Sequence, residues 1–137
     1  MSLKIFIDTN IFLDSYLQRD SGVAKSIFDF LENNNIDIFL NDISIINIAY
    51  IIRKRFTKND IKEKINLITN QYHIVCASEE IISDANNSNF KDFEDGVQYF
   101  CAKKINADLI ITNNKKDFNY SKIEVLTPVE FTLLYID

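Results

Sequence analysis

Three separated stretches of the chain place carboxylates where a strand or a helix would begin or end. Asp8 ends an apolar run near the N-terminus, and the other two stretches supply Asp92 with Asp95, and Asp117. Carboxylates that converge can hold Mg²⁺ or Mn²⁺, because these hard cations prefer oxygen ligands. A bound divalent ion makes a nucleophile of a water and neutralises a phosphate. The residue types therefore point to metal-assisted hydrolysis of a phosphoester.

Each acid also has an ordinary structural explanation. Asp8, taken alone, is slightly more typical of a helix cap than of a metal ligand. Asp92 and Asp95 would lie in the first turn of a helix, where acids stabilise the helix dipole. Asp117 could be a loop acid. Only the joint placement of all four at one edge of a sheet favours the functional interpretation.

The helix expected over residues 92–106 separates its acidic and apolar faces. At about 100° per residue, Asp92 and Asp95 share one face, whereas Glu94 points away from both. Gly96 lies beside the acidic face and would let another backbone or a ligand approach closely. A separate apolar arc consists of Phe93, Val97, Phe100 and Cys101.

The elements that must position these residues alternate between strands and helices. Apolar runs predict strands near 4–8, 36–40, 72–76, 108–112 and 123–126, and helical spacing predicts helices between them and after Pro128. Asn10 is expected to cap the first helix, and Asp42 or Ser44 the helix after the second strand. This alternation predicts an α/β fold in which a central parallel sheet lies between two helical layers.

Composition narrows the class of protein. The chain has 137 residues, of which 47% are hydrophobic, and residues 1–137 are expected to form a single domain. Only two glycines and one proline exclude a Gly-rich phosphate loop and disfavour a β-sandwich. A net charge of −5 argues against binding nucleic acid through a broadly basic surface. It does not argue against a nuclease, because a metal site is itself built from acids.

The cysteines and the hydropathy pattern bear on location. Cys76 and Cys101 lack metal-site spacing and are expected to be buried hydrophobic residues. The sequence has no signal peptide and no apolar run of membrane length, so a cytoplasmic protein without membrane association is expected. The single histidine, His73, falls in an expected strand, which leaves little support for a catalytic triad.

Several of these motifs together carry a family resemblance. The stretch from Phe6 to Ile11, the Asp92-x-x-Asp95 pair and the Thr112-x-Asn114-x-x-Asp117 stretch resemble a PIN domain. PIN domains are small metal-dependent ribonucleases that include the VapC-type toxins of bacterial toxin–antitoxin pairs. The resemblance covers essentially the whole chain and implies a three-layer α/β/α sandwich.

The resemblance also implies roles for individual residues. Asp8 and Asp95 would ligate Mg²⁺ or Mn²⁺, and Asp92 and Asp117 would complete the catalytic set. A supporting polar shell would consist of Asn10, Ser44, Asn47, Thr112 and Asn114. Lys115 and Lys116 flank this proposed site and could meet RNA phosphates.

Two positions depart from the family pattern. Asn47 stands on the helix after the second strand where the family commonly has Glu, and Asn114 replaces an acid that usually follows the Thr of the fourth strand. An amide offers an oxygen to a metal but brings no charge. The resemblance therefore indicates a subtype of the family with a less acidic site.

Three functions remain open from the sequence. The leading one is a metal-dependent endoribonuclease, for which the resemblance implies RNA as substrate, an antitoxin protein as partner and a homodimer. The second is a catalytically inactive PIN-like module that binds RNA or protein. The third is a phosphotransfer domain with Asp8 or Asp117 as phosphoacceptor, for which the expected acidic pair and lysine are not evident.

Overall fold

A single parallel sheet forms the centre of the computed structural model, which describes residues 3–137. Its five strands lie in the order β3-β2-β1-β4-β5, and every neighbouring pair is parallel. β1 is central and its last three residues are completely buried, so its carboxyl end lies at the middle of the sheet edge. The strands are β1 (Lys4–Ile7), β2 (Asp37–Asn41), β3 (His73–Val75), β4 (Leu109–Ile111) and β5 (Glu124–Leu126).

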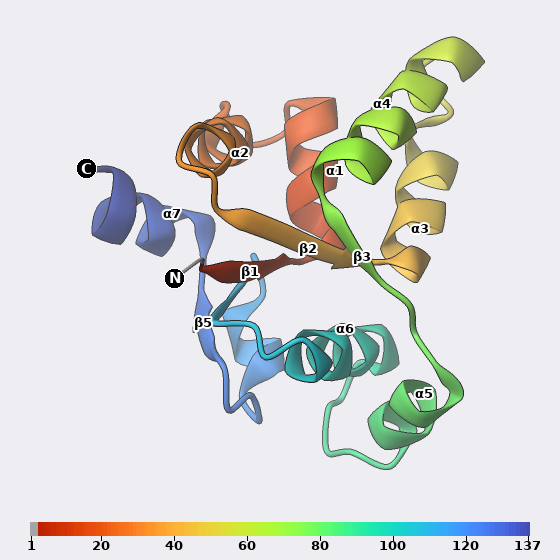
Figure 1. The fold of residues 1–137 in the computed structure, drawn as a ribbon, viewed down its shortest axis with the longest axis vertical. Helices are drawn as coiled ribbons and strands as arrows, with labels where there is room; N and C mark the ends of the chain where they lie inside the picture. The colour runs from red at the N-terminus through yellow and green to blue at the C-terminus, as the bar shows by residue number, and fades with distance from the viewer. Residues whose placement is uncertain (1–2) are drawn as a thin grey trace.

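Helices cover both faces of this sheet (Figure 1). On one face lie α1 (Thr9–Leu17), α2 (Val23–Asn33), α3 (Asp42–Ile52), α4 (Lys58–Gln71) and α7 (Pro128–Phe131), which a π-helical turn, η2 (Thr132–Ile136), continues. On the other face lie α5 (Glu79–Asn86), α6 (Phe93–Lys104) and the short 3₁₀ helix η1 (Lys115–Phe118). The predicted three-layer α/β/α sandwich with a central parallel sheet is confirmed.

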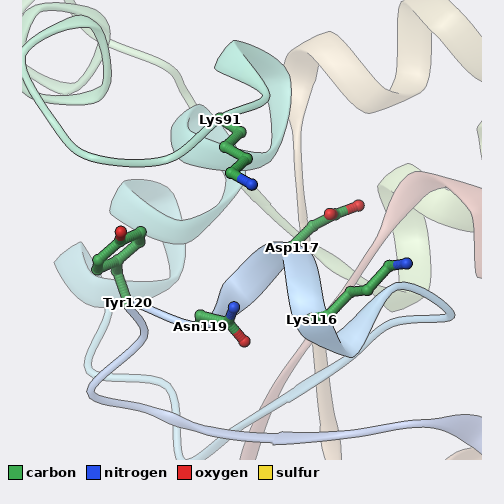
Figure 2. A pocket seen from close by; sticks show the side chains of 5 residues that line it. All are labelled: Lys91, Lys116, Asp117, Asn119 and Tyr120. Atoms are coloured by element: carbon green, nitrogen blue, oxygen red, sulfur yellow. The ribbon is translucent and has the colours of Figure 1, made fainter.

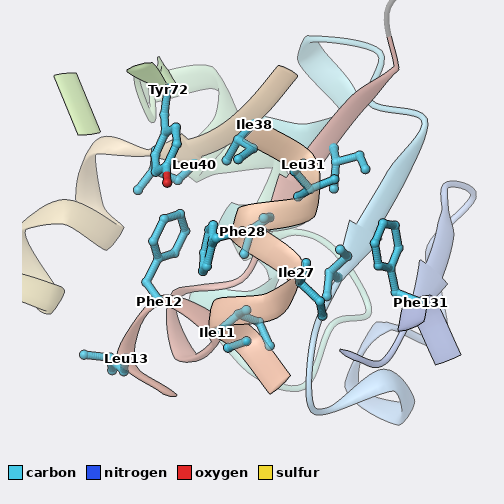
Figure 3. Packing of buried hydrophobic residues seen from close by; sticks show 14 of the residues in the cluster. Ile11, Phe12, Leu13, Ile27, Phe28, Leu31, Ile38, Leu40, Tyr72 and Phe131 are labelled. Atoms are coloured by element: carbon cyan, nitrogen blue, oxygen red, sulfur yellow. The ribbon is translucent and has the colours of Figure 1, made fainter. Parts of the chain in front are cut away.

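Two hydrophobic cores hold the layers together. Ile5 and Ile7 point into the core beneath α1–α4, whereas Phe6 points into the core beneath α5 and α6, as strand alternation requires. In the first core, the ring centroids of Phe12 and Phe28 lie 4.9 Å apart, and the ring of Tyr72 packs near both (Figure 3). Burial on both faces explains why the strand sequences are continuous apolar runs.

Gly96 allows α6 and α5 to pack closely. A Cβ at this position would lie 3.3 Å from the Cβ of Phe90 and 3.4 Å from that of Ala85. Of the two roles expected for this glycine, the structure shows the close approach of another part of the chain.

Helix caps differ from the sequence prediction in two places. Asp8, not Asn10, is the N-cap of α1, and Asn41, rather than Asp42 or Ser44, is the N-cap of α3. In both cases the last polar residue before the helix has an extended backbone and accepts a backbone N–H with its side chain. Each helix therefore starts directly at the end of its strand.

The expectation for the cysteines is half right. Cys101 is buried and accepts a weak hydrogen bond from the Asn41 amide, whereas Cys76 is exposed because it follows the short edge strand β3. Within residues 3–137, no helix combines the length and apolarity needed to cross a bilayer.

Candidate active site

Asp8 lies where the central strand ends and α1 begins. Its backbone N–H donates to the carbonyl of Ile111 at 3.0 Å, so it continues the pairing of β1 with β4 for one more residue. Its side chain is 3% exposed and accepts a long 3.5 Å bond from the backbone N–H of Asn10. Asn10 itself is exposed in the first turn of α1.

Neutral donors hold both carboxylate oxygens of Asp8. Oδ1 accepts from Nε2 of Gln98 at 3.0 Å, and Oδ2 accepts from the hydroxyl of Thr112 at 2.7 Å. The Thr112 hydroxyl in turn accepts from the backbone N–H of Asn114 at 3.1 Å. Asp8 is thus fixed in orientation by two side chains that bring no charge.

A chain of buried hydrogen bonds extends from Gln98 to α3. The Oε1 atom of Gln98 accepts from the backbone N–H of Thr9 at 3.2 Å, and the Thr9 hydroxyl lies 2.6 Å from that of Ser44. The Ser44 backbone N–H donates to the Asn41 cap at 2.7 Å. This network, which we call the Asp8 shell, consists of Asp8, Thr9, Asn41, Ser44, Gln98 and Thr112.

Sequence reasoning did not identify Gln98. The signal was present, because Gln98 is a polar residue inside the otherwise apolar middle of α6 and is only 1% exposed. A buried amide must find hydrogen-bond partners, and these partners are parts of the site. A polar residue three positions after Asp95, inside an apolar stretch of the helix, therefore predicts a contact with the site.

The start of α6 brings further acids to the site. Asp92 is the N-cap and accepts from the backbone N–H of Asp95 at 3.0 Å. Glu94 accepts from Nδ2 of Asn47 at 3.0 Å, which links α6 to α3. The wheel-based expectation that Glu94 points away from the acids is wrong. Phe93 likewise is 52% exposed instead of lying in the core.

The reason for this error is the position of α3. A helical wheel gives directions about one axis, but it does not show which neighbouring element occupies each direction. α3 approaches the first turn of α6 at Asn47, so the side of the helix that carries Glu94 also faces the site.

Electrostatic repulsion concentrates on Asp95. Burial, followed by the negative charges of Asp8, Asp92, Asp117 and Glu94, raises the pKa of the Asp95 carboxyl to about 7. Burial and the charges of Asp8 and Asp92 likewise raise the pKa of Glu94, and the Asn47 hydrogen bond partly opposes this. We call Asp92, Glu94, Asp95 and Asp117 the acidic group.

No lysine, arginine or histidine forms an ion pair with the acidic group within the part of the chain that the structure describes. The ion pairs among residues 3–137 involve other carboxylates. Lys115 pairs with Glu130 at 3.1 Å, so its ammonium is directed toward α7, whereas Lys116 extends from η1 beside Asp117. A bound cation would relieve the repulsion around Asp95.

A second polar contact fixes the segment that follows β4. Asp14, on α1, accepts from Nδ2 of Asn113 at 2.7 Å and pairs with Arg19 at 2.9 Å. Asn113 lies between Thr112 and Asn114, so this contact ties the end of α1 to the segment that holds the Thr112 hydroxyl against Asp8. No periodic pattern along the chain predicts this pairing.

The donors present fit a hard divalent cation that keeps part of its water. All the candidate ligands are carboxylate or amide oxygens, as Mg²⁺ and Mn²⁺ prefer. Among residues 3–137, no three His, Cys, Asp or Glu side chains form a group that could enclose a metal ion by themselves. Mg²⁺ commonly uses one or two carboxylates together with waters and a substrate phosphate, which matches a site of this kind.

Comparisons with known proteins place the whole chain beside one family. The family model described as PIN domain matches residues 4–116. A protein of Aquifex aeolicus (strain VF5) named Ribonuclease VapC1 is 33% identical over 139 residues, which cover 95% of this chain and 94% of that protein.

Solved structures show the same fold at low sequence identity. A toxin–antitoxin complex from Klebsiella pneumoniae contains a chain with a TM-score of 0.68 and 20% identity, covering 90% of this chain and 97% of that one. VapBC2 from Rickettsia felis, bound to a DNA fragment from its promoter, gives a TM-score of 0.66 at 18% identity, covering 91% and 98%.

Proposed function

We propose a function from one premise: the chain belongs to the PIN domain family. On this basis the protein is a divalent-metal-dependent endoribonuclease that hydrolyses RNA phosphodiester bonds, with residues 1–137 acting as one PIN-like domain. The family match over residues 4–116 and the 33% identity to a protein named a ribonuclease support this proposal.

Asp8 and Asp95 are the residues that we propose as ligands of Mg²⁺ or Mn²⁺. A divalent ion bound there would supply Lewis-acid chemistry for phosphodiester hydrolysis. Gln98 and Thr112 would hold Asp8 in the ligating orientation, as the outer hydrogen-bond partners of metal ligands do.

The remaining acids would place Asp95 and orient water. Asp92 shapes the first turn of α6 and thereby places Asp95, whereas Glu94 and Asp117 would orient water at the edge of the site. Asn47 would hold Glu94, and Asn114 would hold the Thr112 hydroxyl through its backbone N–H.

The observation that carries the proposal is the uncompensated repulsion around Asp95. Burial and then four neighbouring carboxylates raise the pKa of its carboxyl, and no ion pair among residues 3–137 offsets these charges. Repulsion of this kind around a carboxylate is typical of a functional site rather than of a structural one. An inactive binding module would have no need to retain this repulsion.

We further propose that the protein is the toxin of a toxin–antitoxin pair and that a cognate antitoxin protein binds it. The similarity to the Aquifex protein named Ribonuclease VapC1 and to a chain of the toxin–antitoxin complex from Klebsiella pneumoniae supports this role. A homodimer is proposed on the same family basis.

The test is cleavage of a mixed RNA population with Mn²⁺, with Mg²⁺ and with EDTA. Cleavage is expected with a divalent ion and not in EDTA. Asp95→Asn should lose it, whereas Asp84→Asn, the same change at an exposed position of α5, should retain it. Metal-dependent cleavage that survives Asp95→Asn would reject the assignment of the site. Absence of cleavage by the wild-type protein under all conditions would reject the activity.

A further inference from the structure

A pocket of about 300 Å³ opens beside the acidic group, between the segment that precedes α6 and η1. Its lining residues are Lys91, Lys116, Asp117, Asn119 and Tyr120. Figure 2 shows Lys91 on the segment before α6, and the other four side chains on η1 and the residues that follow it. We propose that this pocket binds one nucleotide of a single-stranded RNA next to the bond that is cleaved.

The position of the pocket relates it to the candidate site. Asp117 belongs both to the pocket wall and to the acidic group, and Lys91 directly precedes Asp92, the N-cap of α6. A strand whose scissile phosphate reaches Asp8 and Asp95 would therefore place a neighbouring nucleotide here. This inference rests on the proposed ribonuclease function and names a subsite for its substrate.

The charges of the pocket suit a phosphate. Lys91 and Lys116 are exposed, and neither takes part in an ion pair within residues 3–137. Lys115, by contrast, is already paired with Glu130. Two unpaired ammonium groups beside an otherwise acidic site would counter the repulsion between the RNA backbone and the carboxylates.

The aromatic wall of the pocket suits a base. Tyr120 is 56% exposed, and its ring lies 6.2 Å from that of Phe90, which stacks on the buried Tyr99 at 4.9 Å. The Tyr120 ring is therefore supported from behind by a fixed aromatic group and presents surface to solvent. Unpaired bases in single-stranded RNA bind by stacking on such rings.

The size and chemistry of the pocket limit the ligand to one nucleotide. A volume of about 300 Å³ is at the lower end for small-molecule sites. The lining combines cations for a phosphate, a ring for a base, and the amide of Asn119 for a base edge.

A second pocket provides a matched control. It lies between α5 and α6, has a volume of about 370 Å³, and is lined by Lys103 and Lys104 together with Glu80 and Asp84. It shares no residue with the acidic group or the Asp8 shell. Changing two lysines there alters the net charge equally but leaves the proposed subsite intact.

The experiment measures binding of a short fluorescent single-stranded RNA in EDTA, where metal-dependent cleavage cannot occur. Lys91→Glu with Lys116→Glu should weaken binding at least tenfold and reduce the slope of log K against log salt by about 0.7, the contribution of one phosphate contact on a single strand. Lys103→Glu with Lys104→Glu should change affinity less than about threefold.

Variants of Tyr120 distinguish the contribution of base stacking to RNA binding from that of charge. Tyr120→Ala should weaken binding about tenfold without changing the salt slope, and Tyr120→Phe should bind as the wild type does. Lys91→Arg with Lys116→Arg should retain both affinity and slope. Circular dichroism of every variant confirms that the fold is kept.

Three results would overturn the subsite. The two lysine pairs could lose RNA affinity equally, or the pocket variants could bind RNA as the wild type does. The third is that the wild-type protein binds no RNA at low salt. Cleavage with Mn²⁺, measured in parallel, separates the two proposals. Wild-type cleavage with unaffected pocket variants rejects only the subsite. Pocket-dependent binding without any cleavage rejects only the nuclease activity.

Discussion

The two halves of the candidate site are built in opposite ways. The Asp8 shell is buried, its oxygens are satisfied by neutral donors, and its members come from the end of β1, from α1, β2, α3 and α6, and from the end of β4. The acidic group lies at the N-terminus of α6 and on η1, is partly exposed, and consists of carboxylates that repel one another. Hydrogen bonds fix the side chains of the Asp8 shell, whereas the carboxylates of the acidic group repel one another.

This difference separates orientation from charge. Neutral donors can orient Asp8 without bringing a positive charge to it, so the carboxylate remains available to a cation. The acidic group supplies the excess negative charge that a cation would neutralise. Substitutions on the two sides should therefore have different signatures: loss of function with loss of stability in the Asp8 shell, and loss of function with gain of stability at Asp95 in the acidic group.

The largest effect is expected from Asp8→Ala. This change removes a proposed ligand, so cleavage of RNA with Mn²⁺ should fall by more than the roughly 10- to 100-fold that is typical when only an orienting residue is lost. A cleavage assay on variants of confirmed helical content measures it. A fall of less than tenfold would show that Asp8 only caps α1.

Gln98→Leu should have the next largest effect. It removes the 3.0 Å donor to Oδ1 of Asp8, which keeps only the long bond from the backbone N–H of Asn10, and it leaves the Thr9 backbone N–H without its partner. Cleavage should fall about 10- to 100-fold, and the protein should lose about 1–3 kcal/mol of unfolding free energy. Denaturant unfolding beside the cleavage assay measures both. Gln71→Leu, at the exposed end of α4, is the control and should change neither. Loss of stability with full activity would remove Gln98 from the site.

Asp95→Asn should make the metal-free protein more stable. Because the folded-state pKa of Asp95 is about 7 against an ordinary value of 3.8, the native state binds the extra proton between these values. Stability of the wild type should therefore fall as pH rises through this window, and the variant should not share that fall.

Melting in EDTA tests this prediction. At pH 8 the variant should melt about 3 °C above the wild type, and near pH 4 the two should coincide. Added Mn²⁺ should raise the Tm of the wild type but not that of Asp95→Asn. A variant that melts below the wild type at pH 8 would contradict the repulsion that we describe.

Asn47→Asp should have the smallest effect. It replaces the amide that donates to Glu94 with another carboxylate, so it adds charge where the family commonly has an acid. Mn²⁺ affinity, measured by calorimetry, should increase about threefold, in the range of a partly exposed charge interaction. Asn66→Asp on the exposed face of α4 is the control. Unchanged or weaker Mn²⁺ binding would place Asn47 outside the reach of the metal.

Much of the fold could be predicted from the sequence because strand and helix periods are local signals. The apolar runs ending in Asp8 and Thr112 located two neighbouring strand ends correctly. The contributions of Gln98 and Glu94 could not be predicted in this way, because they depend on which element stands beside α6. The caps were misplaced by one to three residues, since several adjacent polar residues could each have served.

The hydrogen bonds that orient Asp8 also set when the protein can become active during synthesis. They join residues 90 positions apart, to Gln98, and 104 positions apart, to Thr112. An emerging chain exposes Asp8 almost at once but cannot fix it until nearly the whole domain has left the ribosome, since chains grow from the N-terminus. Nascent fragments that end before Thr112 should therefore be inert.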